Sequence, residues 1–139
     1  MNASKILVVE DDRVTQKLIA DALRSAGYEV VTAHDGASAV KSARETEPDL
    51  VTLDIQLAKS SPDDSWDGFS VGSWLRRINE GKRTPAIIVV SGLEPAEIIE
   101  SAAAIGAYTF LPKPFKKQKL LDIVAEALRS GAPPSAPSR

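Results

Sequence analysis

The most informative segment of the sequence is Asp49-Leu50-Val51-Thr52-Leu53-Asp54. Its middle is a short apolar run with β-branched residues, a pattern typical of a strand that is buried on both faces of a parallel sheet. The run ends in the carboxylate of Asp54, and a lone charge is very costly to bury inside a core. At the carboxyl end of a strand, however, the acid can face the crevice in which open parallel sheets bind ligands. We therefore interpret Asp54 as a functional residue.

Apolar runs of this kind alternate along the chain with segments of helical periodicity. The expected strands are residues 5–9, 29–32, 49–54, 85–90 and 108–111, and the expected helices are residues 12–26, 37–47, 68–80, 94–105 and 115–129. Strands that alternate with helices join through right-handed crossovers into one parallel sheet with helices on both faces. The sequence therefore predicts an α/β fold with a doubly wound sheet of five parallel strands.

The first expected helix has the clearest boundaries. Asp12 is suited to cap its first turn, and Gly27 is suited to end it. Its apolar residues recur at helical spacing, which predicts one buried stripe. That stripe consists of Val14, Leu18, Ile19, Ala22, Leu23 and Ala26.

Polar residues stand at the carboxyl ends of four expected strands, namely Glu10 with Asp11, Asp54, Ser91 and Lys113. In this architecture those ends converge on one edge of the sheet. Three neighbouring acids repel one another, so a proton or a cation must relieve the repulsion at neutral pH. Carboxylate ligands without His or Cys suit Mg²⁺, while Lys113 and Ser91 can pair with phosphate oxygens. These residue types indicate a site at which the Asp54 carboxylate is transiently phosphorylated.

Four motifs occupy these strand ends, in the order Val8-Val9-Glu10-Asp11, Leu53-Asp54, Val90-Ser91-Gly92 and Phe110-Leu111-Pro112-Lys113-Pro114-Phe115. Together they resemble the response-regulator receiver domains of the chemotaxis-regulator type. The resemblance covers roughly residues 5–129 and implies a flavodoxin-like fold with strand order 2-1-3-4-5. We expect a receiver domain over residues 1–129, followed by a proline-rich, disordered tail or linker over residues 130–139.

The resemblance also implies roles for the site residues. Asp54 would be the phosphoacceptor, and Lys113 and Ser91 would bind the phosphoryl group. The implied Mg²⁺ ligands are Glu10, Asp11, Asp54 and the backbone carbonyl of Gln56. Ser91 and Phe110 would form the switch, and because Phe110 has no hydroxyl, the readout would depend on packing.

The expected function is therefore a phosphorylation-activated switch in two-component signalling, whose only enzymatic chemistry would be Mg²⁺-dependent self-phosphorylation and dephosphorylation. A sensor histidine kinase or a phosphotransfer protein would donate the phosphoryl group. Residues 94–129 would present the change to a downstream partner or a fused output domain. One alternative is a pseudo-receiver that binds partners without being phosphorylated. Another is a Mg²⁺-dependent aspartyl-phosphate phosphatase, although that class needs a second acid where this chain has Gln56.

The segment after Asp54 departs from the family pattern, because residues 55–67 form a longer loop than such connections usually have. We expect Trp66 to pack near Phe69 or over the rim of the site and to report metal binding by its fluorescence. We expect Trp74 to lie in the core. A tight turn is needed where the last strand meets the last helix, so we also predict that the Lys113–Pro114 bond is cis.

Composition narrows the functional class further. The chain has 139 residues, a net charge of -2 and no cysteine. Disulfides and thiolate metal sites are therefore excluded, and non-specific binding of nucleic acid is disfavoured. No stretch has the length and apolar character of a membrane span. We expect a cytoplasmic protein that contacts neither membranes nor nucleic acid directly.

Overall fold

The computed structural model describes residues 4–56, 67–78 and 84–130. In these residues, five parallel strands form one sheet in the order β2-β1-β3-β4-β5. The strands are β1 (Lys5–Val9), β2 (Glu29–Ala33), β3 (Leu50–Leu53), β4 (Ala86–Ser91) and β5 (Thr109–Pro112). The fold class and the strand order predicted from the sequence are confirmed.

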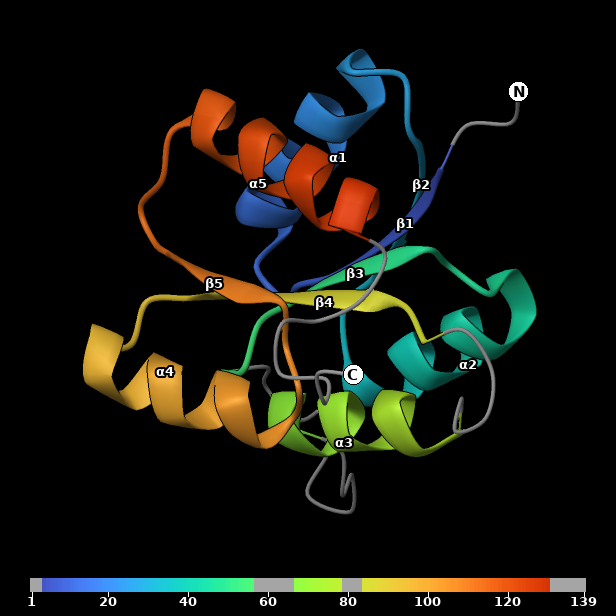
Figure 1. The fold of residues 1–139 in the computed structure, drawn as a ribbon. Helices are drawn as coiled ribbons and strands as arrows, with labels where there is room; N and C mark the ends of the chain where they lie inside the picture. Colours follow the sequence, from blue (N-terminus) through green and yellow to red (C-terminus); the bar gives the residue numbers. More distant parts are fainter. Residues whose placement is uncertain (1–3, 57–66, 79–83, 131–139) are drawn as a thin grey trace.

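The helices alternate with the strands and cover both faces of the sheet (Figure 1). They are α1 (Arg13–Ser25), α2 (Gly36–Thr46), α3 (Gly68–Ile78), α4 (Pro95–Ala104) and α5 (Lys117–Ser130). Helices α1 and α5 lie on one face, and α2, α3 and α4 lie on the other (Figure 1). The chain changes face after α1, so the order of the strands reverses at β1 and β3. Such a reversal opens a crevice at the carboxyl ends of the strands.

Each face has its own apolar core, and β1 contributes to both. Leu7 and Val9 are buried on the face of α2, α3 and α4, whereas Ile6 and Val8 are buried on the face of α1 and α5. Side chains of a strand point alternately to the two faces, so a strand covered on both sides is apolar throughout. This double burial explains why the strands read as continuous apolar runs in the sequence.

Hydrogen bonds of the sheet continue beyond the strand ends into the polar residues. The backbone amide of Glu10 donates to the Ala33 carbonyl at 3.0 Å, and that of Asp54 donates to the Val9 carbonyl at 3.1 Å. Between the ends of β4 and β5, the Lys113 amide donates to the Ser91 carbonyl at 2.8 Å. These bonds align the carboxyl ends of the strands and thereby bring the site residues to one edge.

The boundaries of α1 agree with the prediction, but its exposed face does not. Asp12 caps the helix by accepting from the Thr15 backbone amide at 2.9 Å, and Gly27 has a left-handed φ of 97°. Ile19, Ala22 and Leu23 are buried as expected, whereas Val14 and Leu18 are 69% and 65% exposed and Ala26 is exposed as well. The prediction that the whole apolar stripe is buried was wrong, because the sheet and α5 cover only part of the apolar face of α1.

The remaining differences from the sequence analysis are small. Helix α5 begins at Lys117 rather than at residue 115, and β5 is shifted by one residue toward the C-terminus. Trp74 is partly buried against the core of α2, α3 and α4. Trp66 lies outside the described residues, and so does most of the loop 55–67. None of the described helices combines the length and apolar character that crossing a bilayer requires.

Candidate functional site

Three carboxylates meet where β1 and β3 end. Glu10, Asp11 and Asp54 each offer an oxygen, and these oxygens lie within 4.8 Å of one another. Glu10 and Asp54 are only 1% and 4% exposed, whereas Asp11 is half-buried. Like charges held this close in a poorly hydrated place raise one another's pKa or require a counter-charge.

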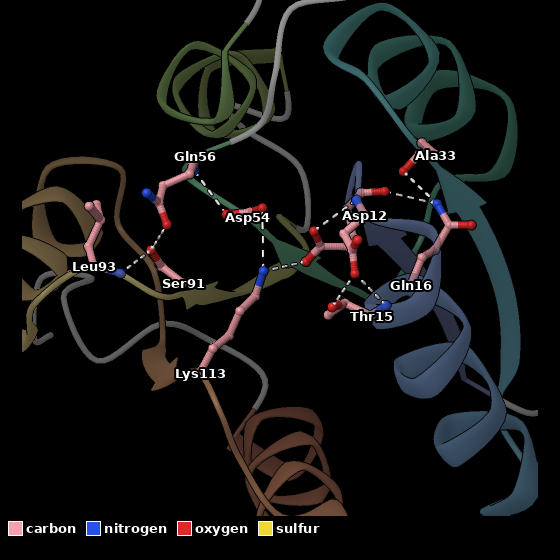
Figure 2. Close-up of polar contacts among 10 residues, drawn as sticks. Asp12, Thr15, Gln16, Ala33, Asp54, Gln56, Ser91, Leu93 and Lys113 are labelled. Carbon is pink, nitrogen blue, oxygen red and sulfur yellow. Dashed lines mark hydrogen bonds and ion pairs between the residues drawn. The ribbon is translucent and has the colours of Figure 1, made fainter.

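Lys113, at the end of β5, supplies part of that counter-charge (Figure 2). Its Nζ donates to Glu10 Oε1 at 2.8 Å and lies 3.5 Å from Asp54 Oδ2. Burial alone would lower the pKa of Lys113, but its hydrogen bond to Glu10 and the charge of Asp54 outweigh burial and raise it. The ammonium group therefore stays charged at neutral pH. The Lys113–Pro114 bond that follows is cis, as predicted.

Glu10 is the acid whose titration is most altered. Burial is the main cause and, together with the nearby charge of Asp54, raises its pKa to about 7, although the hydrogen bond from Lys113 opposes this. Near neutral pH the Glu10 carboxyl is thus divided between its charged and neutral forms. A cation bound among the three acids would favour the charged form and release the proton.

The two oxygens of Asp54 have different environments (Figure 2). Oδ1 accepts from the Gln56 backbone amide at 2.9 Å, while Oδ2 faces Lys113. The amide holds the carboxylate in one orientation and leaves Oδ2 available for chemistry.

Gly68, the first residue of α3, packs directly on the backbone that follows Asp54. A Cβ added at Gly68 would lie 2.3 Å from the Asp54 carbonyl oxygen and 2.5 Å from the Ile55 Cα. Real Cβ atoms do not approach other atoms so closely, and here the neighbours are backbone atoms that cannot rotate away. Only glycine lets the helix approach this closely, so Gly68 helps to set where Asp54 lies.

Ser91 is fully buried at the end of β4, and its hydroxyl is held by two groups (Figure 2). It accepts from the Leu93 backbone amide at 3.1 Å and donates to Gln56 Oε1 at 3.4 Å. The sequence analysis considered only the backbone carbonyl of Gln56 and missed this side-chain contact. No sequence spacing could have found it, because Gln56 follows β3 whereas Ser91 ends β4.

Phe110, the other predicted switch residue, lies on the same face of the sheet as Ser91. It pairs in register with Val89, two residues before Ser91 on β4, and is partly buried against the core of α2, α3 and α4. The structure thus places Phe110 and Ser91 on the same face of the sheet, two residues apart along the strand direction.

Gln16 is a further residue that the sequence analysis did not single out. Its side-chain amide on α1 donates to the backbone carbonyls of Glu10 and Ala33 (Figure 2). A polar residue one turn into a helix gives no signal in a sequence, because most such residues face solvent.

The donors at this edge suit a hard divalent cation. The three clustered acids are oxygen ligands, and the histidine and thiolate ligands typical of zinc are not among them. Mg²⁺ prefers such oxygen ligands and keeps several waters, so two or three carboxylates are enough to bind it. Burial and the charge of Asp54 raise the pKa of Glu10 although Lys113 donates to it, so a bound cation would favour the charged form of this acid. The residues therefore suit Mg²⁺, and a bound cation would compete with Lys113 for Glu10.

A doubly wound sheet with clustered acids, a lysine and a hydroxyl at its carboxyl edge defines the class of open α/β domains that bind ligands at this edge. Comparison with known proteins identifies the family within that class. Residues 6–125 match the response regulator receiver domain, and the chain therefore belongs to this family of two-component signalling domains.

The similar proteins include both single-domain and longer regulators. The chain is 33% identical to the chemotaxis protein CheY of Treponema pallidum over 128 residues, which covers 90% of this chain and 83% of that protein. It is 32% identical to the DNA-binding transcriptional regulator NtrC of Azospirillum brasilense, covering 98% of this chain and 26% of NtrC. A crystal structure of NtrX from Brucella abortus has a TM-score of 0.81 and 32% identity, covering 94% of this chain and 28% of NtrX. The chain thus spans about a quarter of the longer relatives.

Proposed function

We propose that this receiver domain is a switch controlled by phosphorylation of Asp54. The observation that carries the proposal is the arrangement around that residue. Its Oδ2 lies 3.5 Å from Lys113 Nζ, and two further acids lie within bridging distance of a single cation. A buried acid with one oxygen fixed by a backbone amide and the other beside a cation is prepared for nucleophilic attack.

The reaction is transfer of a phosphoryl group to a carboxylate. Asp54 Oδ2 attacks the phosphorus of a phosphohistidine donor, a new O–P bond forms, and the P–N bond breaks. The bonding electrons leave with the imidazole, which takes up a proton. Lys113 stabilises the negative charge of the transferred group. The Ser91 hydroxyl leaves Gln56 and donates to a phosphoryl oxygen.

Mg²⁺ would be held by Glu10, Asp11, Asp54 and the Gln56 backbone carbonyl, and when bound it would neutralise charge on the phosphoryl oxygens. The residues of the chain would then orient the acceptor and exclude water from it. Ser91 would carry the change to Phe110, which lies on the same face of the sheet. The ring would change its packing, and residues 94–129 would alter their contacts with a downstream partner or an output domain.

The donor would be a sensor histidine kinase or a phosphotransfer protein, and the exposed side of α1 offers it a surface. A groove of about 440 Å³ between α1 and α5 is lined by Leu18, Ala22, Phe115 and Leu120, among others. Leu18 is 65% exposed, and Phe115 of the groove follows the site residue Lys113 by two residues in the sequence. An apolar helix of the donor is the kind of partner that such a groove would bind.

The proposal is tested by intact-mass measurement after incubation with acetyl phosphate and Mg²⁺. The wild-type protein should gain the mass of one phosphoryl group, and Asp54→Asn should gain none. Equal labelling of the variant would refute Asp54 as the acceptor. A wild-type protein that is never labelled would favour the alternative that this is a pseudo-receiver. Steady hydrolysis of added phosphate esters would favour the alternative that it is a phosphatase. The domain limits and the cytoplasmic location remain predictions.

A further inference from the structure

The side-chain amide of Gln16 joins the ends of two strands. Its Nε2 donates to the Glu10 carbonyl at 3.0 Å and to the Ala33 carbonyl at 3.2 Å. Ala33 is the last residue of β2, and Glu10 directly follows β1. The Gln16 amide therefore links the two chain segments by hydrogen bonds just beyond the end of the backbone ladder between β1 and β2.

The Glu10 residue is consequently held on both sides of its backbone. Its amide donates to the Ala33 carbonyl at 3.0 Å, and its own carbonyl accepts from Gln16. The Glu10 carbonyl oxygen and the Asp11 nitrogen and Cα lie in one rigid peptide plane. A hydrogen bond that fixes this oxygen therefore also fixes the direction in which the chain leaves toward Asp11.

Asp11 depends on that backbone more than its neighbours do. Glu10 and Asp54 are buried, and their carboxylates are held by Lys113 and by the Gln56 amide, respectively. Within residues 4–56, 67–78 and 84–130, the structure shows no hydrogen bond to the carboxylate of Asp11, which is the most exposed of the three acids. Its position in the acid cluster is thus set by the Glu10–Asp11 peptide.

We propose that Gln16 is a positioning residue for the cation site: its amide orients the Glu10–Asp11 peptide and so places the Asp11 carboxylate among the three acids. This inference rests on the proposed function, because it requires that the cluster bind Mg²⁺. Gln16 itself touches neither the cation nor the phosphoryl group. Its removal should therefore weaken Mg²⁺ binding without removing any group that performs the chemistry.

The test replaces Gln16 with leucine, which has a similar size and no donor. The matched control is Gln118→Leu, because Gln118 Nε2 also donates within the fold, to Asp122 Oδ1 at 2.8 Å on the exposed surface of α5. Two quantities are measured for each protein well below its unfolding temperature. They are the Mg²⁺ dissociation constant from calorimetry and the rate of labelling by acetyl phosphate as a function of Mg²⁺ concentration.

Gln16→Leu should raise the Mg²⁺ dissociation constant about five- to tenfold, which is the effect of roughly one net hydrogen bond. The half-saturating Mg²⁺ concentration for labelling should rise equally, while the maximal rate stays within about twofold of the wild type. Gln118→Leu should change neither quantity. Gln16→His, measured at pH 8, can donate from the neutral imidazole and should recover most of the affinity.

Three results would overturn the inference. The first is an unchanged dissociation constant in Gln16→Leu, even if that variant unfolds at a lower temperature, because Gln16 would then only stabilise the fold. The second is a Gln16→His protein as weak as Gln16→Leu, because the donor would then be irrelevant. The third is a wild-type protein that binds no Mg²⁺, which would refute the proposed function as well. The first two leave labelling of wild-type Asp54 intact and so refute the role of Gln16 alone.

Discussion

Thr52 lies within β3 and Asp54 directly follows that strand, yet the polar groups of the two side chains have different surroundings. Thr52 is in the middle of β3, 1% exposed, and within the described part of the chain its hydroxyl has no hydrogen-bond partner. Asp54 follows the strand, is 4% exposed, and has a backbone amide and a lysine beside its two oxygens. An unpaired buried hydroxyl destabilises the fold, whereas the more polar carboxylate is satisfied. Polar side chains therefore have hydrogen-bond and ion-pair partners at the carboxyl end of the sheet, whereas the buried hydroxyl in its middle has none within the described residues.

The largest expected effect comes from disturbing the supported end at Gly68. Gly68→Ala would place a Cβ 2.3 Å from the Asp54 carbonyl oxygen, so the backbone of β3 or α3 must shift. We expect the free energy of unfolding to fall by about 3 kcal/mol, at the upper end for overpacking, and labelling of Asp54 to be nearly lost. Chemical denaturation and intact mass measure the two effects.

Gly92→Ala is the matched control for this substitution. Gly92 lies at the same edge, after β4, but a Cβ added there would be 3.7 Å from its nearest atom, Gln56 Oε1, which is an ordinary contact. We expect little change in stability. Equal losses in the two variants would show that the edge tolerates no added methyl anywhere and that Gly68 has no special role.

The second prediction concerns the pH dependence of stability that Glu10 causes when no cation is bound. Burial raises the pKa of Glu10 from 4.5 to about 7, so the folded protein keeps a proton that the unfolded chain releases. The stability that protonated Glu10 contributes is fully present below pH 4.5 and is lost as the pH rises toward 7. In a metal-free buffer we expect the stability of the wild type, relative to Glu10→Gln, to fall by about 2 kcal/mol between roughly pH 5 and 7.

Urea denaturation of both proteins in the presence of a chelator measures this difference. Subtracting the Glu10→Gln curve removes the contributions of other acids, such as Asp12, whose pKa is lowered by its hydrogen bonds with Thr15. Parallel curves for the two proteins would mean that Glu10 titrates near its ordinary pKa. The acid cluster would then be better hydrated than its burial indicates.

The smallest effect is expected in the middle of the sheet. Thr52→Val keeps the shape of the side chain and removes a hydroxyl that lacks a partner. The free energy of unfolding should therefore rise by about 1 kcal/mol, while labelling of Asp54 is unchanged. Ser91→Ala provides the contrast, because it removes a buried hydroxyl that has two partners and should lower stability. Destabilisation by Thr52→Val would indicate that its hydroxyl has a partner after all, such as a buried water.

Much of the fold and of the candidate site could be predicted from residues that are neighbours in the sequence. The apolar runs of β1 and β4 specify strands buried on both faces, and their alternation with helices leaves few possible topologies. Glu10, Asp54, Ser91 and Lys113 each end such a run, so their convergence follows from the direction of parallel strands. The cap at Asp12 and the turn after Lys113 also depend on short-range geometry, which local sequence encodes.

The contacts between residues at the edge of the sheet became visible only in the folded structure. The close approach of Gly68 to Asp54, the contact of Gln56 with Ser91, and the bonds from Gln16 to Glu10 and Ala33 join different loops and helices. The same holds for the exposure of Val14 and Leu18, because helical periodicity shows which residues share a face but not how much of that face a neighbour covers. Local patterns determine the elements and their direction, whereas distances between elements depend on the packing of all side chains at once.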